Sequence, residues 1–460
     1  MNRETFIRRV QIEAPVEEVF RWHTRPGALE RLTPPWVKMR VLQRKGGIED
    51  GARVTLELEV GPFRVAWQVE HRGFMENRQF CDVQVRGPFA HWEHAHRFEP
   101  DGEWSCYVQD KVDYALRFGP LGNLLFGHFV HRELERLFIY RHRILTNDIA
   151  LHMSFVPGTP WRILVSGSSG LIGSALIPFL TTGGHEVVRL VRPRSTPSGK
   201  TVAWDPEAGP LDPAELEDFD AVVHLAGESL AGGRWTDERK RRIRDSRVEG
   251  TRLLCEALAR VKRPPRVLVA ASAVGYYGDR GADIVAEDGA PGPGFLAQVC
   301  GDWEAATLPA SRAGIRVVNL RLGAVLSSAG GLLARLLPLF NLGLGGPLGT
   351  GYQSMSWVSI DDAVGIVHHA LFTDQLAGPV NAVSPFHVTN REFAEVLGRV
   401  LGRPARLAVP EKLLRTLFGQ MADEVLLSGS RVEPRRLLDS GYIFDYPEFE
   451  FALRHVLGRV

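Results

Sequence analysis

The sequence predicts an α/β fold with a doubly wound parallel sheet, preceded by a separate α+β domain. Three observations predict it. A glycine-rich turn at Gly167–Gly173 follows an apolar strand and opens a helix. Apolar β-branched stretches alternate with helical stretches from about residue 161 onward, whereas the first 150 residues show strands with a helix at each end. A length of 460 residues also favours more than one domain.

Composition and charge restrict the class of protein. The hydrophobic fraction is 44%, the charged fraction 24% and the formal net charge +1, which are ordinary values for a globular protein and give no attraction to nucleic acid or anionic lipid. No apolar run reaches the ~18 residues that a membrane span needs, and the N-terminus shows no apolar signal segment. We therefore expect a cytoplasmic protein that binds no nucleic acid and does not insert into a membrane. Its four cysteines are scattered and show no metal-ligand spacing: Cys81, Cys106, Cys255 and Cys300.

Residues 1–150 are predicted to form the first domain. Strand-forming residues at 6–12 precede a helix that starts near Ala14-Pro15, and short stretches with period two follow at 54–58, 65–69 and 106–108. Leu124–Leu145 then reads as one long amphipathic helix, with Leu125 and Phe129 among its apolar residues. This order predicts an antiparallel sheet wrapped around a C-terminal helix, with a cavity between them.

Aromatic residues of this domain allow two interpretations, a ligand cavity or an ordinary core. They are Phe63, Trp67, Phe80, Phe89, Trp92 and Trp104. His94 and His96 share one strand face, as metal ligands would, but no third ligand has a clear place in the sequence. We expect a cavity wall or sheet surface there, and no metal.

A linker is expected at 151–160, and residues 161–460 are predicted to form the α/β domain. Apolar strands are expected around 163–165, 187–188, 221–223, 267–269 and 317–318, with helices over 239–261 and 295–313 between them. The sequence Thr389-Asn390-Arg391-Glu392 is a capping box that opens a helix to about Leu401. A small substrate subdomain is expected mainly within 325–460.

The glycine-rich turn predicts a Rossmann-type dinucleotide site. Gly167 permits a tight turn, Gly170 lets the backbone approach a pyrophosphate, and Gly173 allows the following helix to pack closely. The helix N-terminus offers N–H groups and a positive dipole end to the phosphates. The other residues expected to contact the cofactor in this turn are Ser168, Ser169, Leu171 and Ile172.

The second strand of the sheet indicates which dinucleotide is preferred. NAD sites usually place Asp or Glu at the end of this strand to hold the ribose 2′-hydroxyl, but here the strand ends in Val191-Arg192. Arg192, together with Arg194 and Ser168, could hold a 2′-phosphate, since guanidinium binds phosphate bidentately. The alternative is a solvated basic turn. We expect NADP(H) to be preferred over NAD(H).

The chain also resembles two known families. Residues 162 to about 458 resemble the atypical extended short-chain dehydrogenases/reductases, in the epimerase family of the YfcH type (NAD-dependent epimerase/dehydratase). Residues 1 to about 148 resemble the helix-grip fold of polyketide cyclases and START-related proteins (SRPBCC), on Ala14–Phe20 and Arg31–Trp36. The motifs that support the first resemblance are Gly167–Gly173, His224–Glu228, Arg234–Thr236, Ser246–Val248, Ser272–Gly278, Phe295–Ala297, Arg321–Gly323 and Gly343–Gly351 with Trp357.

The first resemblance implies a catalytic serine, Ser272, and a cofactor loop at Leu225, Ala226 and Gly227. The usual Tyr-x-x-x-Lys pair is absent, because aligning the next helix on Glu304 puts Leu296 and Cys300 at those positions. Neither side chain can replace the pair. Cys300 is either a nucleophile or, like most helical cysteines without an activating partner, a small buried side chain. Tyr276 and Tyr277 follow Ser272, and they are either a relocated general acid or walls of the pocket.

Two classes of function fit these residues. The first is an NADP(H)-dependent oxidoreductase or nucleotide-sugar-epimerase-like enzyme of unknown substrate, with an attached domain for a hydrophobic small molecule. The alternative is an NADP(H)-binding regulatory or redox-sensing protein without turnover, or a lipid or isoprenoid carrier. By analogy with the superfamily, we also expect a homodimer.

Overall fold

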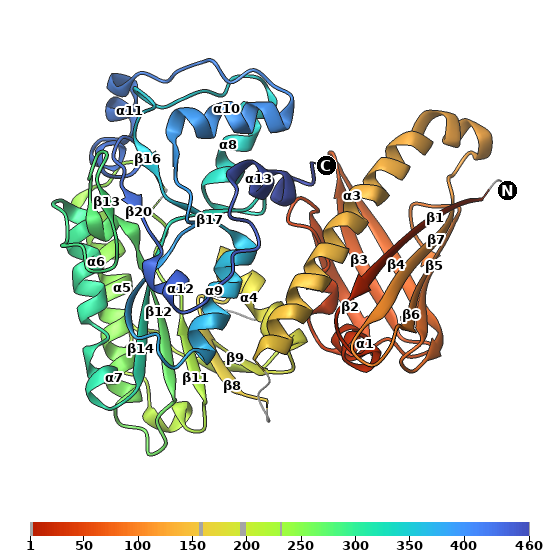
Figure 1. Ribbon diagram of the computed structural model, residues 1–460, viewed down its shortest axis with the longest axis horizontal. Coiled ribbons are helices and arrows are strands. Elements are labelled where there is room, and N and C mark those ends of the chain that lie inside the picture. Colours follow the sequence, from red (N-terminus) through yellow and green to blue (C-terminus); the bar gives the residue numbers. More distant parts are fainter. Residues whose placement is uncertain (1–2, 156–159, 194–198, 231, 460) are drawn as a thin grey trace. The chain divides into compact units, whose positions relative to one another are not determined.

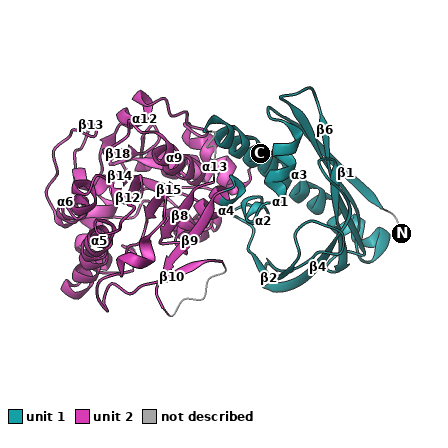
Figure 2. Ribbon diagram, turned by 90° about the horizontal axis from the view of Figure 1, so that it is seen from below, with its two compact units in different colours: residues 1–158, 181–184, 460 teal, residues 159–180, 185–459 magenta. Residues whose placement is uncertain are grey.

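The computed structural model describes residues 3–155, 160–193, 199–230 and 232–459. The chain divides into two compact units, one of residues 1–158 with 181–184 and 460, the other of residues 159–180 and 185–459 (Figure 2). Within the expected linker 151–160, residues 151–154 are still helical and residues 156–159 lie outside the described residues.

The first unit contains an antiparallel sheet in the order β1-β7-β6-β5-β4-β3-β2. Its helix α3 runs along this sheet (Figure 1), and the Phe6 ring of β1 stacks on the Phe138 ring of α3 at 5.4 Å. The strands are β1 (Glu4–Ile12), β2 (Met39–Lys45), β3 (Arg53–Val60), β4 (Phe63–Met75), β5 (Gln79–Arg86), β6 (His91–Pro100) and β7 (Cys106–Ala115), and the helices are α1 (Val16–Thr24), α2 (Ala28–Arg31) and α3 (Gly119–Ser154).

Helix α3 is longer than the sequence predicts. It begins at Gly119 because Pro120 suits the first helical turn, and it ends at Ser154 rather than near Leu145. Two residues expected on its apolar face, Leu125 and Phe129, are exposed. Among the aromatic residues that were expected to line a cavity or core, Phe63 and Trp104 also lie on the surface, whereas Phe80 and Trp92 are buried.

The second unit is built on a parallel sheet in the order β10-β9-β8-β11-β12-β14-β18. In chain order this is 3-2-1-4-5-6-7, the arrangement of a doubly wound sheet whose strand order reverses between β8 and β11. The strands are β8 (Arg162–Ser166), β9 (Glu186–Val191), β10 (Thr201–Ala203), β11 (Ala221–His224), β12 (Val267–Ala273), β14 (Arg316–Leu322) and β18 (Gly378–Ala382). The predicted α/β fold is confirmed.

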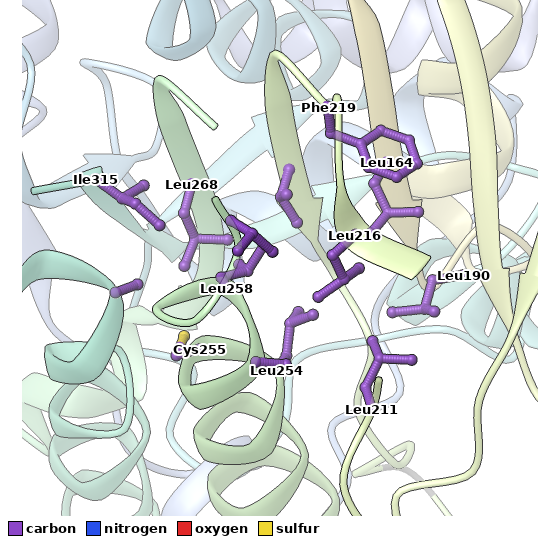
Figure 3. Close-up of a cluster of buried hydrophobic side chains, with 14 of the residues drawn as sticks. Leu164, Leu190, Leu211, Leu216, Phe219, Leu254, Cys255, Leu258, Leu268 and Ile315 are labelled. Carbon is purple, nitrogen blue, oxygen red and sulfur yellow. The ribbon is translucent and has the colours of Figure 1, made fainter. Parts of the chain in front are cut away.

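Helices cover both faces of this sheet. On one face α5 (Asp237–Leu258) and α7 (Leu308–Arg312) pack through a buried cluster in which Leu254 and Leu258 meet Leu268 (Figure 3). On the other face lie α4 (Leu171–Thr182) and α9 (Ile360–Phe372), where the Phe179 and His368 ring centroids are 5.2 Å apart. The expected helix over 295–313 is two helices, α6 (Phe295–Ala305) and α7, because Pro309 at the start of α7 cannot continue α6.

Residues of the expected subdomain within 325–460 supply most of one buried cluster, where Trp357 packs against Phe449, and Leu171 and Ile172 of α4 pack against the same cluster. The predicted capping box is present, since the Thr389 hydroxyl and the Glu392 carboxylate each bind the other's backbone N–H. None of the helices in the described part of the chain is long and apolar enough to cross a membrane. The helices are α8 (Gly331–Asn341), α10 (Asn390–Leu401), α11 (Glu411–Phe418), α12 (Arg435–Asp439) and α13 (Phe449–Leu457), and the short strand pairs are β13 (Ile284–Val285) with β20 (Arg431–Val432), β15 (Ala324–Leu326) with β17 (Trp357–Ser359), and β16 (Ser354–Met355) with β19 (Val388–Thr389).

Candidate functional site

The glycine-rich turn lies at the carboxyl end of β8, where the strand order of the sheet reverses. Gly167 has φ +68°, a conformation that favours glycine. A Cβ at this residue would lie 2.6 Å from the carbonyl carbon of Leu225, which follows the neighbouring strand β11. The two loops therefore touch backbone to backbone at the position where ligands bind in open α/β sheets.

The other two glycines of the turn have different surroundings. A Cβ at Gly173 would lie 2.3 Å from the Gly167 carbonyl oxygen, so the lack of a side chain at Gly173 lets α4 pack closely against the turn. Gly170 is exposed, and a Cβ there would meet only the Gly167 carbonyl oxygen at 3.1 Å. Ser168 is buried and Ser169 exposed, while Leu171 and Ile172 pack against the core of the subdomain.

A buried hydrogen-bond network holds the second loop, Leu225–Gly227. The Ser166 hydroxyl lies 2.7 Å from His224 Nδ1 and accepts the Leu225 N–H at 3.2 Å. His224 Nε2 lies 3.0 Å from the Thr251 hydroxyl, which also accepts the Trp303 indole N–H at 2.9 Å. Burial lowers the pKa of His224 to about 4, so the ring is neutral near pH 7 and links β8, β11, α5 and α6 through polar contacts.

Arg247 places a positive charge beside this loop. A Cβ at Gly227 would lie 3.4 Å from the Arg247 guanidinium carbon, and that carbon is 5.1 Å from the Trp303 ring centroid. Burial lowers the pKa of Arg247 from its ordinary value, although an arginine stays charged at neutral pH. The Glu228 carboxylate interacts electrostatically with this guanidinium. In the sequence, Arg247 is only one residue of the motif Ser246–Val248, and no role was predicted for it.

Arg192 is exposed just beyond β9, and no carboxylate follows that strand within the described residues 192–193. Arg194, which was expected to assist it, lies outside the described residues.

Ser272 lies at the carboxyl end of β12, as expected, but its hydroxyl is buried and occupied. It donates to Glu304 Oε1 at 2.7 Å. Arg321 at the end of β14 binds the same carboxylate twice, through Nε at 2.8 Å and Nη2 at 2.9 Å. Arg321 Nη1 also donates to the Tyr277 hydroxyl at 2.8 Å. The Glu304–Arg321 pair was not predicted, because it joins residues from separate elements.

The two tyrosines after Ser272 differ in their surroundings. Tyr277 is fully buried, and its hydroxyl donates to Asn381 Oδ1 at 2.7 Å while accepting from Arg321. Burial raises the pKa of Tyr277. Tyr276 is only partly buried, and its ring lies 3.6 Å from the Arg321 guanidinium carbon. Of the two, only Tyr276 presents surface to a ligand.

Leu296 and Cys300 lie beside Gly275, in the segment that follows Ser272, as the alignment on Glu304 requires. A Cβ at Gly275 would meet the Leu296 Cβ at 3.5 Å and the Cys300 sulfur at 3.9 Å. Burial raises the pKa of the Cys300 thiol to about 12, so it is protonated at neutral pH and is a poor nucleophile.

Glu424, from the C-terminal part of the chain, caps the helix that carries these residues. Its carboxylate accepts the N–H groups of Phe295 at 3.1 Å and Leu296 at 2.8 Å, the first two residues of α6. A carboxylate at a helix N-terminus satisfies free N–H groups and complements the helix dipole. This cap could not be predicted from the sequence, because Glu424 is more than a hundred positions from Phe295 and Leu296.

Comparison with known proteins shows which families these domains represent. Residues 163–382 match the NAD dependent epimerase/dehydratase family. Residues 409–456, which include Glu424, match a domain of unknown function (DUF1731). Residues 12–139 match the family described as polyketide cyclase / dehydrase and lipid transport.

Individual relatives agree with these matches. An epimerase family protein of Mycobacterium bovis is 45% identical over 297 residues, which are 65% of this chain and 98% of the relative. The crystal structure described as the nucleoside-diphosphate sugar epimerase from Corynebacterium glutamicum has 34% identity and a TM-score of 0.80, and the match covers 98% of this chain and 90% of that one. Human epimerase family protein SDR39U1 with NADPH has 35% identity and a TM-score of 0.60, covering 65% of this chain and all (100%) of that one. The chain thus belongs to the NAD dependent epimerase/dehydratase family and has an N-terminal domain of the polyketide cyclase type.

Proposed function

We propose that the second unit binds NADP(H) and is an oxidoreductase or nucleotide-sugar-epimerase-like enzyme. The contact between the Gly167 turn and the Leu225 loop is the observation that supports this proposal, because the two loops meet where the strand order reverses, which is where dinucleotides bind in open α/β sheets. The pyrophosphate would lie over exposed Gly170 and the N-terminus of α4, and the ribose and nicotinamide along Leu225, Ala226 and Gly227.

A preference for NADP(H) over NAD(H) is part of this proposal. Arg192 is exposed beyond β9, where an NAD site would carry a carboxylate, and its guanidinium suits a 2′-phosphate. The solved structure of the human relative contains NADPH, which supports the same preference.

The chemistry is assigned to the residues around Ser272. Of the three residues expected to be catalytic, Tyr276 is proposed as the proton donor or acceptor, because its ring is partly accessible and lies against the Arg321 cation. Ser272 and Tyr277 are positioning residues, since their hydroxyls are engaged with Glu304, Arg321 and Asn381. Arg247 supplies the fixed positive charge that the missing lysine would bring to the cofactor ribose.

A second candidate is a protein that binds NADP(H) without turnover, as a regulatory or redox-sensing module. The observation that favours it is the placement of Leu296 and Cys300 beside the serine loop, where a tyrosine and a lysine would normally act. The two candidates differ in one respect. An oxidoreductase oxidises NADPH with some member of a panel of carbonyl substrates, whereas an epimerase interconverts nucleotide-sugar epimers with no net change in the cofactor. In either case Tyr276→Phe lowers the rate without weakening NADPH binding, and a protein without turnover gives neither reaction.

The cofactor assignment is tested by thermal denaturation of the full chain with NADPH, with NADH and with neither. A ligand at about 100 times its Kd stabilises the native state by about 2.7 kcal/mol, which corresponds to a melting-temperature rise of about 5 °C for a unit of this size. We expect this rise with NADPH, a smaller one with NADH, and no difference between the two in Arg192→Ala.

The matched control is Arg266→Ala, which removes an exposed arginine at the amino end of β12, the opposite edge of the same sheet. This variant should keep the preference for NADPH. Equal shifts by both dinucleotides in the unmodified chain would contradict the preference, and no shift by either would contradict the site.

The first unit is proposed to bind an apolar small molecule, as its family match suggests. Mass spectrometry of ligands that co-purify with the full chain, and with a chain lacking residues 1–148, tests this. A ligand retained only by the full chain supports a binding or lipid-carrier role for this domain. Light scattering during size-exclusion chromatography tests the expected homodimer.

A further inference from the structure

The inner face of the first unit holds a buried cluster of ionisable side chains that its proposed role as an apolar-ligand domain does not explain. Burying charged or polar groups is unfavourable unless each one has a partner. Neighbouring strands and helix α3 supply the cluster: His71 from β4, Asp82 from β5, His94 and His96 from β6, Asp110 from β7 and His142 from α3.

Asp82, His94 and His96 each place one potential metal-ligand atom close to the other two. Asp82 pairs with His94 across β5 and β6, and the three ligand atoms all lie within 4.8 Å of one another. Asp82 Oδ2 is 3.8 Å from His94 Nδ1 and 3.5 Å from His96 Nε2. These separations are longer than an ordinary hydrogen bond, and they are close to the ~3.3 Å between neighbouring ligands of a tetrahedral ion with bonds of about 2.0–2.1 Å.

Asp110 fixes the orientation of His94 and His96 through the ring nitrogens that do not face Asp82. Its Oδ1 lies 2.8 Å from His94 Nε2 and 2.8 Å from His96 Nδ1, while its Oδ2 lies 2.6 Å from His142 Nε2. A carboxylate at this distance accepts an N–H from each ring. The opposite ring nitrogens, which face Asp82, are then left with lone pairs. Carboxylates hold metal-ligating histidines in this way in established metal sites.

Three lone-pair-bearing atoms that face one another repel unless a cation lies among them. The cation could be a proton. A metal ion would take the place of that proton. The second oxygen of Asp82 is held separately, since Oδ1 lies 2.9 Å from His71 Nε2.

We propose that Asp82, His94 and His96 bind one divalent transition-metal ion, for which Zn²⁺ has the most suitable ligand preference. Two imidazoles and one carboxylate form a common ligand set for zinc, and three protein ligands leave a further position for water or a ligand oxygen. Asp82 is the most accessible of the three, with 23% of its side chain exposed, so the ion would be reached from its side. The proposal is independent of the function proposed for the second unit.

The sequence predicts no metal site because only two candidate ligands, His94 and His96, share a strand face. The third, Asp82, is twelve positions before His94 and on a different strand, and only the register of the sheet brings them together.

The test uses the untagged full chain, stripped with a chelator and titrated with Zn²⁺ by calorimetry, with metal content measured by mass spectrometry. We expect one equivalent of Zn²⁺ per chain. Asp82→Asn and His96→Gln remove a ligand and should weaken binding by at least tenfold. Asp110→Asn leaves all three ligands in place and should weaken binding about 10–100-fold through their orientation. The matched control, His91→Gln on the outward-facing side of β6, should bind as the unmodified chain does.

Substitution of Co²⁺ in the unmodified chain gives a readout that does not depend on how the variants fold. Visible absorption bands of Co²⁺ bound by nitrogen and oxygen are expected. A thiolate charge-transfer band would place Cys81 in the ligand set and overturn the assignment. Failure to bind Zn²⁺ or Co²⁺, or unchanged binding by Asp82→Asn with native circular dichroism, would also overturn it and leave the protonated His96 as the occupant.

Discussion

Arg321 and Glu304 form a two-point ion pair beneath the candidate site. Arg321 Nε and Nη2 bind the two carboxylate oxygens of Glu304, and the exposed fractions of the two side chains are 3% and 14%. Glu304 accepts from Ser272, and Arg321 donates to Tyr277. This pair therefore connects the ends of β12 and β14 with α6 and sets the position of Tyr276 above it.

Removing one partner of this pair should destabilise the second unit strongly. Arg321→Met leaves the Glu304 carboxylate buried without its cation, which costs about 3–5 kcal/mol in comparable pairs. Scanning calorimetry of the transition of the second unit measures the loss. The double variant Arg321→Met with Glu304→Leu should lose less than the sum of the single variants. Additive losses would show that the two residues do not act as a pair.

Acid should destabilise the second unit through His224. Its pKa is about 4 in the folded chain because of burial, and about 6.5 when unfolded. The unfolded state thus binds the proton first, so the contribution of a neutral His224 is complete above pH 6.5 and is lost as pH falls from 6.5 to 4, at up to about 1.4 kcal/mol per pH unit.

The variant His224→Gln provides the comparison, because it has no titrating ring while other buried groups remain. The free energy of unfolding of this variant should be lower at pH 7 and should fall less steeply between pH 6.5 and 4.5. Parallel pH profiles of the two proteins would contradict the assignment.

The cap formed by Glu424 should stabilise α6. Glu424→Ala leaves the N–H groups of Phe295 and Leu296 without their acceptor, and we expect a loss of about 1–2 kcal/mol. Thermal denaturation of the second unit measures it. Glu411→Ala, which removes an exposed carboxylate paired with Arg415, should cost no more than about 0.5 kcal/mol. If Glu424→Ala and Glu411→Ala lose the same free energy of unfolding, the cap does not stabilise α6 more than an exposed ion pair would.

Arg247 should contribute to cofactor affinity. A hydrogen bond to a charged group contributes about 1.5–3 kcal/mol, so Arg247→Met should raise the Kd for NADPH by at least about tenfold. Fluorescence titration measures the Kd. The control is Arg244→Met, one turn earlier on α5, where the guanidinium binds Asp302 instead. If both variants bind NADPH equally well, Arg247 does not contact the cofactor.

The strands and turns of the second unit could be predicted from the sequence because their signals are local. The Gly167 turn, the apolar strands and the Thr389 capping box each involve residues a few positions apart, and the structure contains all three. The break between α6 and α7 was missed although Pro309 marks it, because the apolar pattern continues through it.

The parts that could not be predicted depend on contacts between distant residues. Asp82 joins His94 only through strand register, Glu304 meets Arg321 at the ends of separate elements, and Glu424 reaches α6 from the C-terminal region. The apolar side chains of Leu125 and Phe129 predicted burial, but nothing in the described part of the first unit covers them. Periodicity shows which residues share a face of an element and does not show what packs against that face.

Calorimetric titration of NADPH into the unmodified chain, Gly170→Asp and Gly301→Asp tests the dinucleotide site most directly. Gly170 is exposed and its φ is not positive, and a Cβ there lies 3.1 Å from the Gly167 carbonyl oxygen, so the turn must shift slightly to accept the aspartate, whose charge then repels the pyrophosphate. Gly301→Asp adds the same charge on α6, where a Cβ meets no atom within 4 Å. The account predicts at least about tenfold weaker binding in Gly170→Asp alone, since one repulsive contact of about 1.4 kcal/mol suffices. Equal affinity in all three proteins would contradict it.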